Sequence, residues 1–271
     1  MWFLGKEIRL SRLINPDSGK MLAITVDHSI SRGIMTGLIP IQKTIDTIIQ
    51  GRPDAITMHK GIAEKCFFRH AGKASLILKC SSFSPYQPAC DALLADVDEA
   101  VRLGADAISI GCIVGGKDQP VQLENLGRIS RDAASAGMPL VAHIYPRGES
   151  IAKEDRYKWE NIAYAVRAGA ELGVDLIKTS YTGDPDSFAR VVAACPARVV
   201  IAGGEVGSEI ADYLRMTRDV MDIGCAGVTY GRFVWEYKNI AALIRVLKFI
   251  IHEKGSVKEG LEMLKDLEAE L

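Results

Sequence analysis

The sequence predicts an α/β protein built as a single (β/α)8 TIM barrel with an extra C-terminal helix. Strand-like apolar runs alternate with helical patterns from Met21 to His252, which favours a parallel sheet covered by helices. Helix, glycine and strand follow one another repeatedly along this stretch. The length of 271 residues is close to the ~250 that such barrels usually need.

Eight short runs are predicted strands. Several are apolar almost throughout, as expected for strands that helices cover on both faces. The predicted strands are Met21–Asp27, Asp54–His59, Ala74–Ser81, Asp106–Gly111, Pro139–Tyr145, Val174–Thr179, Arg198–Ala202 and Gly227–Gly231.

The segments between the strands are predicted helices. Asp91–Leu103 carries apolar residues at helical spacing, and Gly104 follows as a C-terminal cap before the next strand. Similar helix-to-strand junctions are expected at Gly137, Gly173 and Gly224. The repeat is structural, because no strong internal sequence repeat accompanies it.

We predict one domain over residues 1–271, because no linker rich in proline, glycine or serine divides the chain. Residues 1–20 form an N-terminal lead-in, and Ile240–Glu253 is the eighth helix of the barrel. Residues 255–271 are predicted to form a further amphipathic helix, with Ser256 as its N-cap. This helix packs on the barrel or on a neighbouring subunit.

An open, doubly wound sheet is the competing fold. It would place a glycine-rich nucleotide-binding turn directly after the first strand. The residues that follow this strand, Asp27-His28-Ser29-Ile30-Ser31-Arg32-Gly33, lack the Gly-x-Gly-x-x-Gly pattern. The barrel is therefore preferred.

Composition narrows the possible partners. The chain is 48% hydrophobic and 25% charged, with a formal net charge of −1, which favours neither nucleic acid nor a membrane surface as a partner. Its apolar runs are shorter than the ~20 residues of a membrane-spanning helix, and the N-terminus does not resemble a signal peptide. A cytoplasmic location is expected.

The cysteine and histidine spacing predicts no metal site. None of the six cysteines forms a Cys-x-x-Cys pair, and the five histidines have no ligand-like spacing. Cys112 and Cys225 are expected in the core.

Lys178 is the strongest candidate for chemistry. It ends the apolar run Val174–Lys178, and burial of an ammonium lowers its pKa. A neutral lysine is a nucleophile that condenses with a ketone to form an imine. The alternative is that this strand-end lysine simply extends to solvent.

Two further strand-end residues can supply proton transfer. Alternation along a strand puts Thr25 with Asp27 on one face and His143 with Tyr145 on one face. Tyr145 could then act as general acid and base, and Asp27 could relay or orient protons. The alternatives are a buried tyrosine with a satisfied hydroxyl and an aspartate that caps the next helix.

Glycines after the seventh and eighth strands predict a phosphate site. Gly203 and Gly204 end one strand, and Gly231 with Arg232 ends the next. The loops at these two positions commonly bind phosphate in this fold, and an arginine adds a fork of donors. Either glycine site alone is weak evidence, because glycine is common in turns.

Several motifs together resemble a known family, the class I aldolases of the DeoC/LacD/FbaB type. This group includes the archaeal-type fructose-bisphosphate aldolases and the 2-amino-3,7-dideoxy-D-threo-hept-6-ulosonate synthases. The resemblance extends from about Met21 to His252. The most specific motifs are Tyr145-Pro146-Arg147-Gly148 and Lys178-Thr179-Ser180-Tyr181-Thr182-Gly183-Asp184.

The resemblance implies that Lys178 forms the Schiff base, Tyr145 is the acid/base residue and Asp27 the assisting carboxylate. It also implies a phosphate pocket, lined by Gly203, Gly204, Gly231 and Arg232, for a phosphorylated sugar. Such enzymes use no metal or other cofactor and assemble into rings of five or ten subunits.

Four residues depart from the family pattern. Ser29 and Ile34 replace glycine and proline in the first loop, and Glu205 and Phe233 follow the two phosphate-site glycines. These changes leave the amine, the phenol and the first carboxylate in place. Glu205 would repel a phosphate unless it points away.

The expected function is reversible cleavage of fructose 1,6-bisphosphate into dihydroxyacetone phosphate and glyceraldehyde 3-phosphate. An alternative keeps the imine but condenses a ketose-phosphate-derived donor with aspartate semialdehyde. A non-catalytic barrel that binds sugar phosphates and a metal-dependent aldolase are further alternatives that the sequence favours less.

Overall fold

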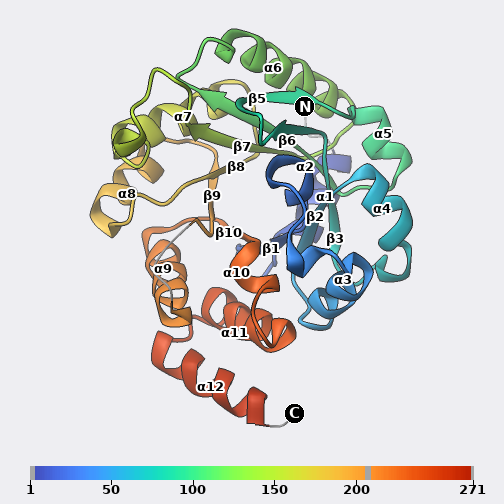
Figure 1. Ribbon diagram of the computed structural model, residues 1–271, viewed down its shortest axis with the longest axis vertical. Helices are drawn as coiled ribbons and strands as arrows, with labels where there is room; N and C mark the ends of the chain where they lie inside the picture. The colour runs from blue at the N-terminus through green and yellow to red at the C-terminus, as the bar shows by residue number, and fades with distance from the viewer. Residues whose placement is uncertain (1–3, 205–208, 270–271) are drawn as a thin grey trace.

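A closed ring of eight parallel strands forms the centre of the protein (Figure 1). The computed structural model describes residues 4–204 and 209–269. Around the ring the strand order is β1-β10-β9-β8-β7-β6-β3-β2. The predicted (β/α)8 barrel is confirmed.

Each barrel strand lies within two or three residues of its predicted position. The barrel strands are β1 (Met21–Thr25), β2 (Ala55–His59), β3 (Ser75–Lys79), β6 (Ala107–Val114), β7 (Leu140–Pro146), β8 (Leu176–Thr179), β9 (Arg198–Ala202) and β10 (Gly227–Tyr230).

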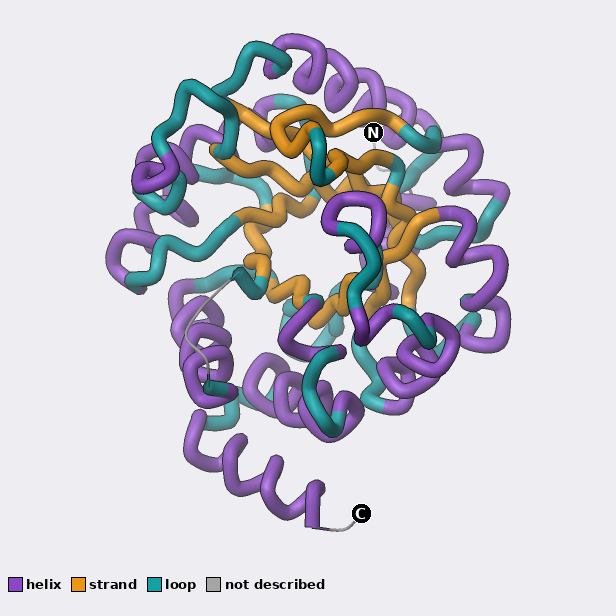
Figure 2. Tube along the Cα trace, in the orientation of Figure 1, coloured by secondary structure: helices purple, strands orange, loops and turns teal. Residues whose placement is uncertain are grey.

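Helices surround the ring of strands, as the tube view makes plain (Figure 2). Short 3₁₀ turns lie at Thr36–Leu38, Phe68–His70 and Lys153–Asp155. The helices are α1 (Leu4–Leu13), α2 (His28–Arg32), α3 (Ile41–Gln50), α4 (Lys60–Cys66), α5 (Val97–Arg102), α6 (Gln119–Ser135), α7 (Trp159–Glu171), α8 (Pro185–Ala193), α9 (Ile210–Ile223), α10 (Arg232–Trp235), α11 (Ile240–His252) and α12 (Val257–Ala269).

The N-terminal lead-in contains a helix that closes one end of the barrel. Leu10 and Leu13 of α1 pack against the small and aliphatic side chains that fill the interior of the ring. Two ion pairs fasten the helix to the N-terminal ends of barrel strands, because Lys6 lies 2.9 Å from Asp175 and Arg12 lies 3.0 Å from Asp106.

One predicted helix is partly wrong. The segment after β3 forms an antiparallel hairpin of β4 (Ser81–Ser84) and β5 (Gln87–Leu93), so the helix predicted over Asp91–Leu103 starts only at Val97. The Asp96 carboxylate caps it by accepting a hydrogen bond from the Glu99 amide at 2.8 Å. Short apolar runs are compatible with both helix and strand. The first part of this segment forms a strand because it pairs with β4.

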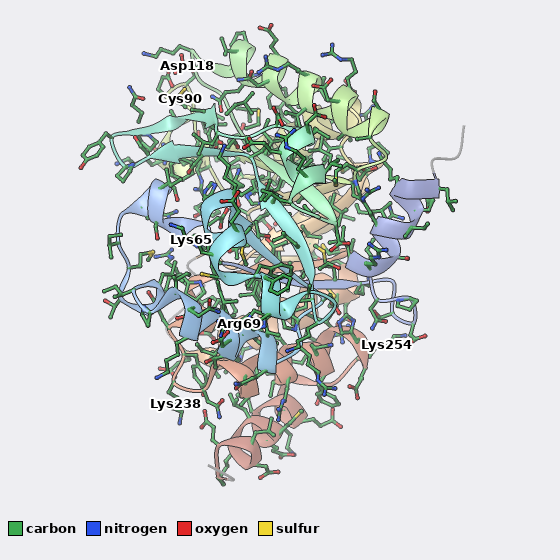
Figure 3. The ribbon with its side chains drawn as sticks, turned by 90° about the vertical axis from the view of Figure 1, so that its right-hand side faces the viewer. Lys65, Arg69, Cys90, Asp118, Lys238 and Lys254 are labelled. Atoms are coloured by element: carbon green, nitrogen blue, oxygen red, sulfur yellow. The ribbon has the colours of Figure 1, made fainter. Side chains whose placement is uncertain are left out.

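The hairpin and the N-terminal helix lie at opposite ends of the barrel. Figure 3 shows this from the side, with the labelled Cys90 on the hairpin at one end and helix α1 at the other. Gln122 of α6 fastens the hairpin to the barrel wall, because its side-chain amide donates to the Ala89 carbonyl at 2.9 Å.

The predicted C-terminal helix is present as α12. A capping box starts it, since the Glu259 amide donates to the Ser256 hydroxyl at 3.2 Å and the Ser256 amide donates to the Glu259 carboxylate at 2.9 Å. The helix packs on α11 and α9 and extends beyond the body of the barrel (Figure 1).

Glycines with left-handed backbone end several helices, as the sequence predicts. Gly104 has φ of 69° and Gly224 has φ of 103°, a region that only glycine enters without strain. Cys112 and Cys225 are buried in the core as expected. Within the described ranges, no helix has the length and apolar character needed to cross a membrane.

Candidate active site

A pocket of about 630 Å³ opens at the C-terminal ends of the barrel strands. This is the end at which enzymes of this fold carry out their chemistry. All seven residues that the sequence predicts for the site line this one pocket: Asp27, Tyr145, Lys178, Gly203, Gly204, Gly231 and Arg232.

Lys178 is buried and lines the pocket instead of extending to the outer surface. It is only 7% exposed, and its register partner on the neighbouring strand β7 is His143. Burial is the main cause that lowers the pKa of the Lys178 amine to about 8; the charge of Asp27 opposes this shift, and the charges of Lys79 and Arg147 add to it. A useful fraction of the amine is therefore neutral near pH 7.

Tyr145 provides a phenol that stays protonated. It lies on β7 and faces the pocket, and the Arg147 guanidinium lies 4.2 Å from the centre of its ring. Burial raises the pKa of Tyr145 to about 12. The phenol can therefore give a proton to a nearby oxygen and take it back.

Asp27 is an ionised carboxylate beside the amine. It follows β1 at the N-cap position of α2, yet within the described chain its side chain accepts no capping hydrogen bond. Burial alone would raise its pKa, but the charges of His28 and Lys178 outweigh burial and lower it. The capping alternative is therefore not supported.

The predicted phosphate residues lie together at the ends of β9 and β10. A Cβ at Gly231 would lie 2.5 Å from the His28 imidazole and 2.8 Å from the Thr25 hydroxyl, so only glycine fits there. Phe233 also lines the pocket, and it stacks on Tyr213 with ring centres 3.9 Å apart.

The four departures from the family pattern fall in different places. Phe233 forms part of the pocket wall. Ile34 is 80% exposed, and among the pocket-lining residues the first loop contributes Ser31 and Arg32 rather than Ser29 or Ile34. Glu205 lies outside the described residues, so its effect on a phosphate stays a prediction.

Several titratable residues that line the pocket had no predicted role, and His143, Lys79 and Asp91 are the buried ones among them. His143 shares the inward face with Tyr145, and burial lowers its pKa well below the usual value. Lys79 is the last residue of β3 and Lys178 is the last but one of β8, so a lysine near a strand end is a signal that the sequence offers. Asp91 gave no such signal, because its segment was predicted as a helix. Lys60, which directly follows β2, pairs with Glu99 at 2.8 Å.

Residues 21–237 match the family described as DeoC/LacD family aldolase. The chain belongs to this family. Among its curated relatives in the DeoC/LacD family, the 2-amino-3,7-dideoxy-D-threo-hept-6-ulosonate synthase of Halobacterium salinarum is 34% identical, over 95% of both chains. The 2-amino-4,5-dihydroxy-6-oxo-7-(phosphonooxy)heptanoate synthase of Streptomyces griseus is 30% identical over 93% of this chain and 92% of its own.

Solved structures agree with this membership of the DeoC/LacD family. An archaeal fructose 1,6-bisphosphate aldolase superposes with a TM-score of 0.83 at 29% identity, covering 92% of this chain and 99% of its own. Another structure of an archaeal fructose-1,6-bisphosphate aldolase, at 28% identity and a TM-score of 0.83 over the same shares, has its catalytic lysine covalently bound to the carbinolamine intermediate of the substrate.

The comparisons place the protein in an aldolase family, and a further solved neighbour, at 28% identity and a TM-score of 0.82, is a Schiff-base-forming fructose-1,6-bisphosphate aldolase. Over the described residues, no three His, Cys, Asp or Glu side chains gather in an arrangement that could hold a metal ion.

Proposed function

We propose that this protein forms and breaks a carbon–carbon bond of a phosphorylated ketose through a Schiff base on Lys178. The observation that carries the proposal is a buried lysine of lowered pKa in one pocket with a protonated phenol and an ionised carboxylate. Imine chemistry needs these three groups: a neutral amine, a proton donor and a proton acceptor.

The reaction begins at the ketone. The neutral amine of Lys178 adds to the carbonyl carbon, and Tyr145 donates a proton to the resulting hydroxyl, which leaves as water. The iminium ion then withdraws electrons from the adjacent carbon. When Asp27 or the Tyr145 phenolate takes the proton of the C4 hydroxyl, the C3–C4 bond breaks, the aldehyde forms and the electron pair becomes the enamine.

Hydrolysis completes the cycle. The enamine carbon takes up a proton, and water then adds to the imine and releases the ketone while Lys178 returns to the free amine. Run in reverse, the same steps join an aldehyde to the ketone donor. No step requires a metal or other cofactor, so we expect turnover to persist in a strong chelator.

The substrate phosphate is proposed to bind at the ends of β9 and β10. Gly203, Gly204 and Gly231 expose backbone there, and Arg232 adds a guanidinium. Backbone amides beside glycines are common phosphate ligands in this fold.

The first candidate substrate is fructose 1,6-bisphosphate, which the protein would cleave to dihydroxyacetone phosphate and glyceraldehyde 3-phosphate. Its support is the likeness to archaeal fructose-bisphosphate aldolases at 28–29% identity across nearly their whole length. A second candidate is synthesis of an amino-dideoxy-heptulosonate by condensation of a ketose-phosphate-derived donor with aspartate semialdehyde. Its support is the higher identity to synthases, 34% and 32%.

Borohydride trapping is the first test. Incubation with dihydroxyacetone phosphate and borohydride should leave a reduced adduct on the peptide that contains Lys178, and Lys178→Met should abolish it. A folded wild-type protein that forms no adduct with this ketone, or with a panel of ketose phosphates, would contradict the proposal and favour a barrel that only binds sugar phosphates.

Two product assays then separate the candidate substrates. Release of glyceraldehyde 3-phosphate from fructose 1,6-bisphosphate supports the aldolase, whereas condensation that depends on aspartate semialdehyde supports the synthase. We also propose a homo-oligomer of five or ten subunits, which sedimentation of the purified protein tests directly.

A further inference from the structure

A buried lysine and aspartate on the far side of the pocket have no part in the chemistry proposed above. Lys79 ends β3, and Asp91 lies on β5 of the hairpin. Their side chains are 6% and 4% exposed, and both line the same pocket as Lys178. Charged groups this deep require partners, because burial of an unpaired charge is costly.

Their mutual contact is incomplete. The Lys79 ammonium donates a hydrogen bond to the Ser81 hydroxyl at 2.9 Å, but it lies 3.9 Å from the Asp91 carboxylate oxygen Oδ1. That separation is too long for a hydrogen bond. Among the described residues, Asp91 Oδ1 has no hydrogen-bond partner although it is buried.

Both groups are nevertheless held in place. The Ser81 hydroxyl also accepts a hydrogen bond from the Gly111 amide at 2.7 Å, which fixes the acceptor for Lys79. The Asp91 carboxylate lies over Gly111, where any Cβ would overlap it. The amide of Asp91 donates to the Gln122 side chain at 3.4 Å. The gap between the two charges is therefore built into the barrel mouth.

The size of the gap suits one oxygen atom. An oxygen can lie about 2.8 Å from each of two groups that are 3.9 Å apart. A hydroxyl in that position accepts from the ammonium and donates to the carboxylate, so it satisfies both. A substrate ammonium would be repelled by Lys79, and a carboxylate or phosphate would be repelled by Asp91.

The position in the ring indicates which hydroxyl this is. In the closed order of strands, β3 stands four places from β9 in either direction, so it faces the phosphate end across the barrel. A ketone donor with its phosphate at β9 and β10 and its carbonyl carbon on Lys178 directs its remaining carbon toward β3. In dihydroxyacetone phosphate that carbon carries a hydroxyl.

We propose that Lys79 and Asp91 form a subsite for the hydroxyl on the carbon next to the imine, on the side away from the phosphate. The inference rests on the imine function proposed above. It means that the enzyme selects hydroxylated ketone phosphates over their deoxy counterparts when the donor binds.

The test compares two donors. Dihydroxyacetone phosphate carries the hydroxyl, and hydroxyacetone phosphate has hydrogen in its place. The borohydride trapping rate at Lys178 is measured for both at low concentration, in the wild type, in Asp91→Asn and in Lys79→Met. Both donors react with the same amine, so the ratio of their rates cancels any change that a substitution causes in Lys178 itself.

We expect each substitution to reduce the preference for dihydroxyacetone phosphate by about tenfold or more, the value of a hydrogen bond to a charged group. Trapping of hydroxyacetone phosphate should fall much less. Asp98→Asn and Lys73→Met change exposed residues near the same elements and should keep the wild-type ratio, and circular dichroism checks folding.

The outcomes separate the two proposals. Adducts that form on Lys178 in all proteins with an unchanged ratio overturn the subsite alone, and so does a wild type that traps both donors at equal rates. Complete absence of adducts from the folded wild type overturns the imine function and the subsite together.

Discussion

At the scale of single residues, the pocket keeps an amine, a phenol and a carboxylate in the protonation states that imine chemistry needs. Lys178 and Tyr145 are both buried, which lowers the pKa of the amine and raises that of the phenol because burial disfavours the charged form of each. Asp27 stays ionised because positive neighbours outweigh its burial.

Replacement of Lys178 should stabilise the protein while it abolishes adduct formation. The pKa of the amine is about 8 in the folded chain against a usual 10.5, so below pH 8 the folded state bears a cost for the buried charge. Lys178→Met removes this cost, and we expect the free energy of unfolding at pH 7 to rise by on the order of 2–3 kcal/mol.

Urea unfolding of both proteins across pH measures this effect. The advantage of Lys178→Met should be full below pH 8 and should shrink as the pH rises through 8 toward 10.5, where the native lysine is neutral in either state. A variant that is less stable than wild type at pH 7 would contradict the expectation.

Imine formation should accelerate with pH. The reactive species is the neutral amine of Lys178, so the trapping rate at low ketone concentration should rise about tenfold per pH unit below 8 and level off above it. Cyanoborohydride trapping between pH 6 and 10 gives the profile. A midpoint near the ordinary lysine value would mean that the amine is not desolvated in solution.

At the scale of elements, the sequence predicts the barrel strands well and the hairpin poorly. Strands such as β1 and β6 are apolar almost throughout, and that pattern predicts a strand that helices cover on both faces. Asp91 belongs to a segment whose apolar residues fit both the helical and the strand periodicity. Only its pairing with Ser81–Ser84 and its contact with Gln122 make it a strand. The long-range contacts that decide such cases leave no local trace in the sequence.

The same limit applies to the site. Lys178, Tyr145 and Asp27 could be found because each ends or follows a predicted strand. The Lys79–Asp91 pair could not, since its two members come together only through the hairpin. The roles assigned to the site residues stay predictions until the variants are measured.

The loops after β6 and β7 depend on one close approach. A Cβ at Gly148 would overlap the backbone of Gly115 and Gly116, which cannot move aside as a side chain can. Gly148→Ala should therefore cost about 1–3 kcal/mol of stability or more and displace the neighbouring Arg147 from Tyr145.

Gly61→Ala is the matched control. Nothing lies within 4 Å of a Cβ at Gly61, which is on helix α4, so alanine there should be neutral or stabilising by up to about 1 kcal/mol. Thermal unfolding of the two variants checks the contrast, and equal shifts would mean that the loops adjust freely.

At the scale of the whole molecule, the helix that closes the barrel and the pocket lie at opposite ends of the ring of strands. Helix α1 closes the N-terminal end with Leu13, which is fully buried, and the pocket opens at the other end. This separation is general in the fold.

Leu13→Ala tests the separation. Removal of this buried side chain should destabilise the protein by about 2–5 kcal/mol, while the trapping rate of the folded protein at Lys178 stays within about twofold of wild type, because the substitution lies at the far end of the barrel. Leu4→Ala on the same helix, where the side chain is 73% exposed, should change stability by no more than about 0.5 kcal/mol. Loss of trapping in folded Leu13→Ala would contradict the separation.

The β4–β5 hairpin has a consequence for how this enzyme can diversify. Among the described residues its strands pair only with each other, outside the closed ring, yet Asp91 on the hairpin lines the pocket. Mutations in the hairpin can therefore change which donor is accepted without disturbing barrel closure or the reactive lysine. Related proteins that act on other substrates are expected to differ first in the sequence of the β4–β5 hairpin. Exchange of this hairpin between relatives is therefore the direct way to alter donor selectivity.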